Sequence, residues 1–346
     1  MSPIPIQTRK ATMADFFAFA EESESRRRQM LRTAFGPAIA AALVDPAVIE
    51  VMVNPDGRLW LDKAGEGRIE TANRMAASET ERIIRLVAAH VRCQVTDSSP
   101  IVSAEWPETG ERFEGLIPPI APAPCFAIRK PAAVVFSIDD YVAARIMSEA
   151  QADVLRTAIR DRHNIVVAGG TSSGKTTLVN ALLAQVALLD ERVVILEDTR
   201  ELRCAAPDCV TLRTKPGIVS LAELVRSTLR LRPDRIIVGE IRGPEALDML
   251  KSWNTGHPGG ITTVHANSPV MALYRLEQLI QEAVVTVPRD LLALTIEHIV
   301  FIDGRGNDRR IASIHEVEGL SADGDYKLKP LACKPLRVVP NNGDGE

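Results

Sequence analysis

The most informative stretch of the chain reads Gly169-Gly170-Thr171-Ser172-Ser173-Gly174-Lys175-Thr176, followed by Thr177. The apolar run 165–168 precedes it, and the helix-like segment 178–183 follows it. Glycines at both ends allow a tight backbone path whose N–H groups surround an anion, and the following helix adds the positive end of its dipole. The pattern G-x-x-x-x-G-K-T between strand and helix therefore predicts a nucleotide-binding phosphate loop rather than a merely glycine-rich turn.

The loop also assigns roles to its last residues. Lys175 should reach the β- and γ-phosphates, Thr176 should place its hydroxyl on Mg²⁺, and Thr177 should lie near the phosphates as a further hydroxyl donor. A phosphate loop alone leaves kinase, GTPase, helicase and transport ATPase open.

The composition indicates a globular chain with more than one core. Its 346 residues are 46% hydrophobic, which suits two domains. No apolar run approaches the ~18 to 20 residues of a membrane span, and the N-terminus resembles no signal peptide, so we expect a cytoplasmic protein whose membrane contact is peripheral. The five cysteines form no C-x-x-C pair, and their odd number argues against a disulfide framework.

The charge pattern bears on partners. A net charge of −4 argues against bulk binding of nucleic acid without excluding it. The run Arg26-Arg27-Arg28 is a local basic patch. Such runs are usually solvated helix faces, and the alternative is contact with an anionic lipid surface or a partner protein.

Periodicity divides the chain near its middle. Residues 1–130 read as a small α+β domain with a helical N-terminal segment, strands at 48–53, 58–62 and 125–128, and a helix at 79–91. Residues 131–148 read as a connection. Strands and helices then alternate over 149–320, which predicts the α/β class with a parallel sheet covered on both faces. The polar tail 321–346 should be disordered at its extreme end.

Two carboxylates follow the apolar strand that ends at residue 196. Glu197 and Asp198 stand at the C-terminal end of this strand, the edge where α/β sheets bind ligands. They can orient water or Mg²⁺. The alternative is that they cap the strand end or the next helix.

A second acid follows the strand 235–238. The segment resembles a Walker B strand, but Gly239 stands where most such strands carry the Mg²⁺-binding Asp. Glu240 must then activate water or hold a metal-bound water, unless it is simply a surface acid at a strand end.

A glycine-rich turn leads into a strand that ends on His265. This histidine closes another strand at the same sheet edge, which favours a γ-phosphate-sensing role over a structural one. His257 lies in the turn itself, and for this residue the sequence favours a phosphate-sensing role and a structural role equally.

These segments, in this order, resemble the secretion and pilus traffic ATPases. The motifs on which this resemblance rests are the phosphate loop, Glu197-Asp198-Thr199-Arg200-Glu201, Gly239-Glu240-Ile241-Arg242, and Gly256-His257 with His265-Ala266-Asn267. The N-terminal half resembles the type IV secretion and conjugation branch, nearest the TrbB-like conjugal transfer ATPases. The motifs on which this second resemblance rests are Asn54-Pro55-Asp56-Gly57, Glu111-Arg112-Phe113 with Pro118-Pro119, and Ala127-Ile128-Arg129-Lys130-Pro131. The four-cysteine zinc motif common in pilus and type II secretion assembly ATPases is absent from this sequence.

The resemblance implies a RecA-like P-loop ATPase domain at the C-terminus, a smaller PAS-like domain at the N-terminus, and a homohexameric ring. It implies ATP and Mg²⁺ as ligands, with Thr176 and Glu240 at the metal. The catalytic set would be Lys175, Glu197, Glu240 and His265, with Arg112 and Arg129 sent toward the phosphates from the N-terminal domain. The arginines 226, 230, 232, 235 and 242 would serve subunit interfaces or pair within the sheet.

The expected function is ATP hydrolysis that powers a conjugation or type IV secretion apparatus at the inner membrane, in contact with its inner-membrane components. The alternatives are a pilus or type II secretion assembly or retraction ATPase, and a nucleotide-gated scaffold with negligible hydrolysis. A GTPase is disfavoured because the sequence contains no Asn/Thr-Lys-x-Asp motif. DNA translocation is harder to exclude, because recombinases share the core fold.

Overall fold

The computed structural model describes residues 30–31, 33–106, 110–131, 135–215 and 217–331. The chain forms two compact units, Met1–Ala133 and Val134–Glu346. The basic patch at residues 26–28, and the part of the expected tail beyond residue 331, lie outside the described residues.

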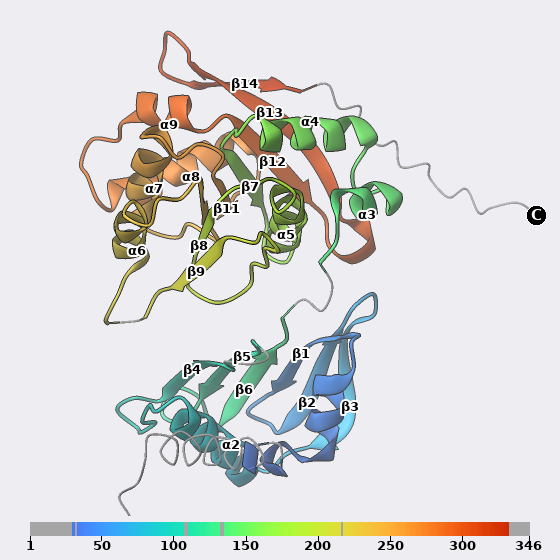
Figure 1. The fold of residues 1–346 in the computed structure, drawn as a ribbon. Helices are drawn as coiled ribbons and strands as arrows, with labels where there is room; N and C mark the ends of the chain where they lie inside the picture. The colour runs from blue at the N-terminus through green and yellow to red at the C-terminus, as the bar shows by residue number, and fades with distance from the viewer. Residues whose placement is uncertain (1–29, 32, 107–109, 132–134, 216, 332–346) are drawn as a thin grey trace, which may run out of the picture. The chain divides into compact units, whose positions relative to one another are not determined.

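The first unit is an antiparallel sheet with helices on one face (Figure 1). A helix over residues 30–31 and 33–44 comes first. The other elements are β1 (Val48–Val53), β2 (Arg58–Lys63), β3 (Gly67–Arg74), α2 (Ala77–His90), β4 (Ile101–Glu105), β5 (Arg112–Leu116) and β6 (Cys125–Arg129). The strand order is β3-β2-β1-β6-β5-β4, and every neighbouring pair is antiparallel.

Alternation along the strands separates the two faces of this sheet. Val51, Phe113 and Ile128 are buried against apolar side chains of the two helices. Residues that neighbour these in sequence point to the other face, because successive side chains of a strand alternate. The core of this unit therefore lies on one side of the sheet, and the other side carries charged residues.

The second unit is a mixed α/β layer structure. Its helices are α3 (Ile138–Ala143), α4 (Glu149–Arg160), α5 (Lys175–Val186), α6 (Leu221–Thr228), α7 (Glu245–Asn254), α8 (Pro269–Gln281), α9 (Arg289–Thr295) and the short η1 (Gly306–Asp308). Its strands are β7 (Ile165–Gly169), β8 (Val193–Glu197), β9 (Cys209–Arg213), β10 (Arg235–Val238), β11 (Ile261–His265), β12 (His298–Asp303), β13 (Arg310–Leu320) and β14 (Tyr326–Pro330).

The sheet of the second unit has the order β14-β13-β12-β7-β11-β10-β8-β9. From β12 to β9 all neighbours are parallel, whereas β13 and β14 add an antiparallel edge. The helices α6 to α9 cover one face and α3 to α5 cover the other, as Figure 1 also shows. The expected α/β class with helices on both faces is confirmed.

Strand β7 shows why the site forms where it does. All five of its residues are buried, with Val166 and Ala168 packed into one apolar core and Ile165 and Val167 into the other. A strand buried on both faces reads as a continuous apolar run. The strand then ends at the carboxyl edge between β12 and β11, which is where the phosphate loop begins.

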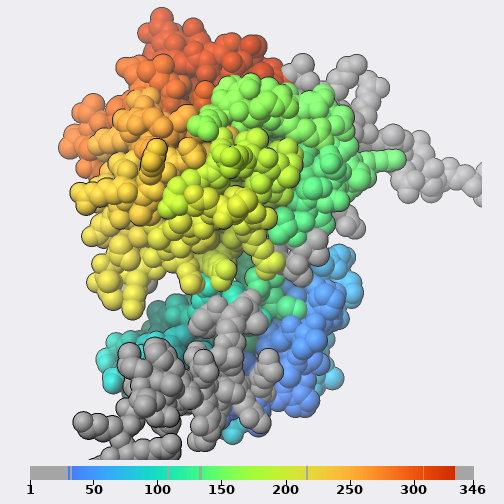
Figure 2. Space-filling model, viewed as in Figure 1, coloured from blue at the N-terminus to red at the C-terminus, as the bar shows by residue number. Residues whose placement is uncertain are grey.

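The structure differs from the expected boundaries in two places. The segment 131–148 is not only a connection, because α3 within it buries Ile138 and Tyr141 in the core of the second unit. Within the expected tail, β14 pairs with β13, and Tyr326 is buried. Gln151 of α4, from early in this unit, donates to the carbonyl oxygen of Ile311 on the late strand β13 at 3.0 Å, and Figure 2 shows the green segment of α4 beside the red end of the unit.

Candidate nucleotide site

The phosphate loop has the backbone that its glycines predict. Gly174 has a φ of +96° and directly precedes α5, so the loop enters the helix through a conformation that a side chain would strain. A Cβ at Gly169 would lie 2.4 Å from the carbonyl oxygen of Ile302 and 2.7 Å from Oγ of Ser173. Both glycines are therefore required by local geometry.

Lys175 is buried at the start of α5 and already uses its donors. Its Nζ donates to the carbonyl oxygens of Gly169 at 3.1 Å and Gly170 at 3.0 Å, and it lies 3.1 Å from Nδ1 of His265. An ammonium group can only donate, so Nδ1 of His265 must accept. Burial is the main cause that lowers the pKa of Lys175. The loop thus holds a desolvated cation against backbone oxygens.

His265 links this cation to an acid. Since Nδ1 accepts, the neutral imidazole carries its proton on Nε2, which lies 2.9 Å from Oε1 of Glu240. Burial, followed by the charge of Lys175, lowers the pKa of His265 below its usual value, and this outweighs the opposite effect of Glu240. Lys175, His265 and Glu240 therefore lie side by side at one edge of the sheet and are here called the relay, with the histidine neutral at pH 7. Oε1 of Glu240 is within ion-pairing distance of Nε2 but meets no hydrogen bond of good geometry among the described residues.

Glu240 is held from its other side by Arg242, whose guanidinium donates to Oε2 at 2.5 Å. This hydrogen bond is the main cause that raises the pKa of Arg242. Of the five arginines that we expect at subunit interfaces or in pairs within the sheet, Arg242 thus belongs to the nucleotide site. The sequence does place Arg242 in the motif Gly239-Glu240-Ile241-Arg242, apart from the other arginines of that stretch, but only the structure shows that it pairs with the carboxylate of Glu240.

Gly239 has a packing reason for lacking a side chain. A Cβ there would lie 3.2 Å from Cγ of Glu197, which is tighter than an ordinary contact. Its carbonyl oxygen also accepts a hydrogen bond from Oγ1 of Thr263 at 2.9 Å. The departure from the usual acidic residue therefore makes room for the carboxylate on β8.

Glu197 is only 3% exposed. Its Oε1 accepts backbone N–H bonds from Glu201 at 2.9 Å and Leu202 at 2.8 Å. Glu197 accordingly stabilises the turn after β8, as the capping interpretation predicts, while its position beside Gly239 keeps it at the same sheet edge as Glu240. Asp198 accepts a hydrogen bond from Oγ1 of Thr214 at 3.0 Å.

The rest of the loop is open to a ligand. Thr171 and Ser172 are exposed, while Thr176 and Thr177 are half-buried in the first turn of α5. Within the described part of the chain, Oγ of Ser173 is buried without a hydrogen-bond partner. A buried hydroxyl facing a loop of backbone N–H groups suits a phosphate oxygen as its missing partner.

His257 lies at the opposite end of β11 from His265. Its Nδ1 is 2.9 Å from the carbonyl oxygen of Pro233. The structure therefore does not bring His257 to the phosphate loop, and its role is that of a turn residue. A strand separates its two ends by about 3.3 Å per residue, which explains why two nearby histidines in sequence are distant in space.

Arg112 and Arg129 belong to the first unit. They lie directly opposite each other on β5 and β6, and Arg129 also faces Glu50 on β1 while Arg112 faces Glu105 on β4. All four point away from the apolar core of that unit. Their relation to the phosphate loop stays a prediction.

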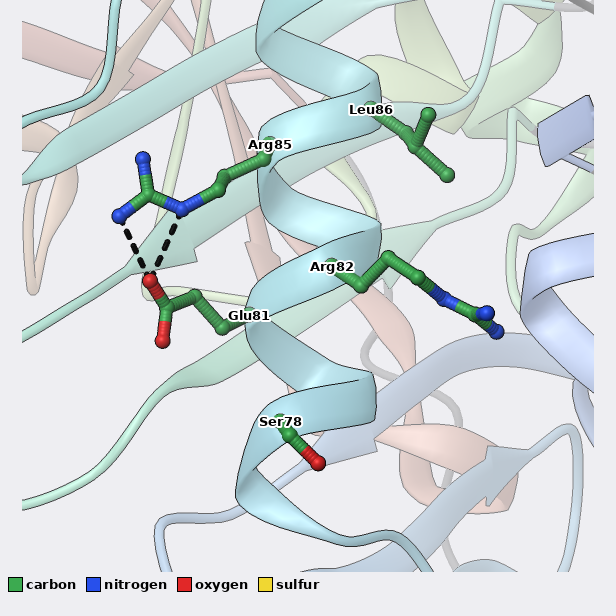
Figure 3. Close-up of a pocket in the computed structure, with 5 residues that line it drawn as sticks. All are labelled: Ser78, Glu81, Arg82, Arg85 and Leu86. Carbon is green, nitrogen blue, oxygen red and sulfur yellow. Dashed lines mark hydrogen bonds and ion pairs between the residues drawn. The ribbon is translucent and has the colours of Figure 1, made fainter.

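A surface hollow on α2 of the first unit does not add a second site. Its lining residues are Ser78, Glu81, Arg82, Arg85 and Leu86 (Figure 3). Arg85 is already bonded to Glu81 at 2.6 Å and to the carbonyl oxygen of Val95 at 3.1 Å, and Arg82 points away from this pair in Figure 3. The hollow is the side of a solvated helix.

The nucleotide site suits a Mg²⁺ ion that is held by few protein ligands together with the phosphates. The described ranges contain no cluster of three or more His, Cys, Asp or Glu side chains able to hold a metal ion by themselves. Mg²⁺ is usually held by one or two protein ligands together with substrate phosphates and water. The hydroxyl of Thr176 and the carboxylate of Glu240 match that requirement.

The same described residues contain no helix of the length and apolarity that crossing a bilayer requires.

A phosphate loop after an inner strand of a parallel sheet, with an acid and a histidine at the ends of nearby strands, defines a P-loop nucleotide-binding protein of the α/β class. Two solved structures show the same fold. The pilus retraction motor PilT with bound ADP is 18% identical, with a TM-score of 0.57 over 84% of this chain and 80% of that one. The ATPase DotB of Legionella pneumophila is 17% identical, with a TM-score of 0.56 over 83% and 77%.

Sequence comparison gives the family. The family model described as "Type II/IV secretion system protein" matches residues 34–302. The conjugal transfer protein TrbB of Rhizobium radiobacter is 46% identical over 299 residues, which are 86% of this chain and 92% of that protein. The type IV secretion system protein PtlH of Bordetella pertussis is 31% identical over 313 residues, covering 80% and 92%. The chain belongs to the type II/IV secretion system protein family, and the resemblance to its conjugal transfer branch is confirmed.

Proposed function

We propose that this chain hydrolyses ATP to ADP and phosphate. The observation that carries the proposal is the relay, in which Lys175 of the phosphate loop, His265 and Glu240 are joined at 3.1 Å and 2.9 Å. A cation can hold the phosphates and a carboxylate can accept the proton of the attacking water, and here both lie at one edge of the sheet, with a neutral imidazole between them.

Each residue of the relay has a proposed task. The oxygens of an entering triphosphate would replace the backbone carbonyls that Lys175 now contacts. His265, released from the ammonium, would report the γ-phosphate. Glu240 would accept the proton of the attacking water, and Glu197 would supply the second carboxylate at the edge. Bound Mg²⁺, held by the hydroxyl of Thr176 and, through a water, by Glu240, would neutralise the charge that develops on the phosphates.

Arg112 and Arg129 are proposed to act on the same phosphates from the first unit. Their adjacent positions on β5 and β6 would let both guanidiniums meet one anion. Two cations directly opposite each other repel, and an anion between them would relieve that repulsion. The carboxylate of Glu50 faces Arg129, and burial is the main cause that raises the pKa of this acid.

At the level of the cell we propose a homohexameric motor of conjugation or type IV secretion, cytoplasmic and peripheral to the inner membrane. The relatives named as conjugal transfer and type IV secretion proteins support this. The parallel sheet is compatible with a RecA-like domain and the antiparallel sheet with a PAS-like one. The proposed partners are further copies of the chain, inner-membrane components and an anionic membrane surface. Turnover that DNA stimulates in a salt-dependent manner would instead favour a DNA translocase.

The test is phosphate release from ATP by the purified chain and by Lys175→Ala. We expect turnover in the wild type and none in the variant, because the lysine is the phosphate loop's own cation. Lys251→Ala, which removes an exposed cation from α7, is the matched control and should keep wild-type turnover. Near wild-type hydrolysis by Lys175→Ala would refute the site, and a wild type that binds ATP without releasing phosphate would favour the scaffold.

A further inference from the structure

The hairpin between β12 and β13 brings a second cation to the phosphate loop. β12 is a hydrogen-bonded neighbour of β7, and the hairpin turns through η1 into Arg309. A Cβ built on Gly174 would lie 2.7 Å from Nε and 2.8 Å from Cζ of Arg309. The guanidinium therefore lies against the loop at the residue immediately before Lys175.

This guanidinium lacks a partner in the described part of the chain. Its Nε is buried and meets no hydrogen-bond acceptor there, and no ion pair to Arg309 is present among the same residues. The adjacent Arg310, in contrast, donates to Asp303 at 3.0 Å. A buried N–H without an acceptor is costly, so the side chain is poised for an anion.

Two further buried hydroxyls lack a hydrogen-bond partner among the described residues. They are the hydroxyls of Ser173 in the loop and Tyr141 in α3. The charge of Arg309 acts on Tyr141, and Ile311, two residues further on, donates its N–H to Ile146 just after α3. Within the described ranges, Arg309 is thus accompanied by an unpartnered hydroxyl of the loop and by a tyrosine of α3 that is close enough for the charge of Arg309 to act on it.

The order of the strands shows which part of a nucleotide would lie there. Glu240 and His265 follow β10 and β11, on one side of β7, whereas Arg309 follows β12 on the other side. If the reacting γ-phosphate faces the relay, the α-phosphate and nucleoside must leave the loop on the side of Arg309. We propose, resting on the function proposed above, that Arg309 binds the α-phosphate end of the nucleotide within the same chain.

The experiment measures the dissociation constants of ADP and of inorganic pyrophosphate, which lacks the α-phosphate and nucleoside. For Arg309→Ala we expect ADP affinity to fall by at least about tenfold, with pyrophosphate affinity unchanged, because only ADP reaches the guanidinium. Arg310→Ala removes the same charge one residue away and should leave both constants within about twofold of wild type. Arg309→Lys keeps the charge and should recover part of the loss.

Several results would overturn the inference. One is wild-type ADP affinity in Arg309→Ala, and another is an equal loss for ADP and pyrophosphate, which would place the arginine at the β-phosphate. A lysine variant as weak as the alanine variant would exclude charge as the cause. A wild-type chain that binds neither ligand would refute the proposed function, and this inference with it, whereas the other results leave the proposed function standing. The melting temperature without ligand should not fall in Arg309→Ala, since the change removes a buried N–H without an acceptor and breaks no ion pair among the described residues.

Discussion

Replacing Glu240 by glutamine separates the chemistry of the site from its stability. Oε1 of Glu240 lies 2.9 Å from Nε2 of His265, Oε2 accepts from Arg242 at 2.5 Å, and the side chain is 21% exposed. Glutamine preserves the size and one accepting oxygen but removes the charge. An ion pair of this exposure contributes about 0.2–1 kcal/mol, so the free energy of unfolding should fall by less than roughly 1 kcal/mol.

The effect on turnover should be far larger. General bases accelerate reactions by about 10²- to 10⁴-fold, which corresponds to roughly 3 to 5 kcal/mol of activation free energy. Glu240→Gln should therefore bind ATP and barely hydrolyse it. Steady-state phosphate release gives the rate, calorimetric titration gives ATP binding, and denaturant unfolding gives the stability.

Arg242→Gln is the matched control, because it breaks the same ion pair and leaves the carboxylate in place. It should lose much less turnover than Glu240→Gln. Equal losses in the two variants would mean that the ion pair, and not proton transfer, limits the rate. If Glu240→Gln hydrolyses ATP within about twofold of wild type while Glu197→Gln is inactive, the principal acid lies on β8 and the reasoning is refuted.

Three further predictions concern other parts of the molecule. Arg129→Ala should lose at least about tenfold in turnover, roughly 1.4 kcal/mol, and the double variant with Arg112→Ala should show non-additive losses; wild-type rates in the double variant would exclude this role. Burial is the main cause that lowers the pKa of His298 to about 4. Below the usual histidine pKa near 6.5, the folded chain then binds fewer protons than the unfolded chain, so the free energy of unfolding should fall by roughly 2 kcal/mol between pH 7 and pH 5. Denaturant titrations at the two pH values measure this loss, which should be absent in His298→Gln. Gly260→Ala should destabilise the second unit by about 1–3 kcal/mol in thermal unfolding, because its Cβ would lie 2.0 Å from Cε2 of Trp253, and an unchanged melting temperature would contradict that packing.

Features that contiguous residues build can be predicted from the amino-acid sequence. The phosphate loop is one, because its anion-binding N–H groups, its glycines and the N-terminus of α5 follow one another along the chain. The parallel sheet is another, because doubly buried strands such as β7 leave an apolar run between helical patterns. These signals depend on local backbone geometry and on periodicity, and both can be read without knowing distant contacts.

Contacts between side chains that are distant in the sequence depend on the fold. Glu240 and His265 end neighbouring strands, and their 2.9 Å separation depends on the strand order and register. The same holds for Arg309, an ordinary hairpin arginine in the sequence that packs against Gly174. Short elements such as α3 and β14 were missed because their stability comes from burial against distant residues rather than from intrinsic propensity. Contacts between groups far apart in the chain leave no periodic signal, and for that reason the sequence indicates the candidates while the fold selects among them.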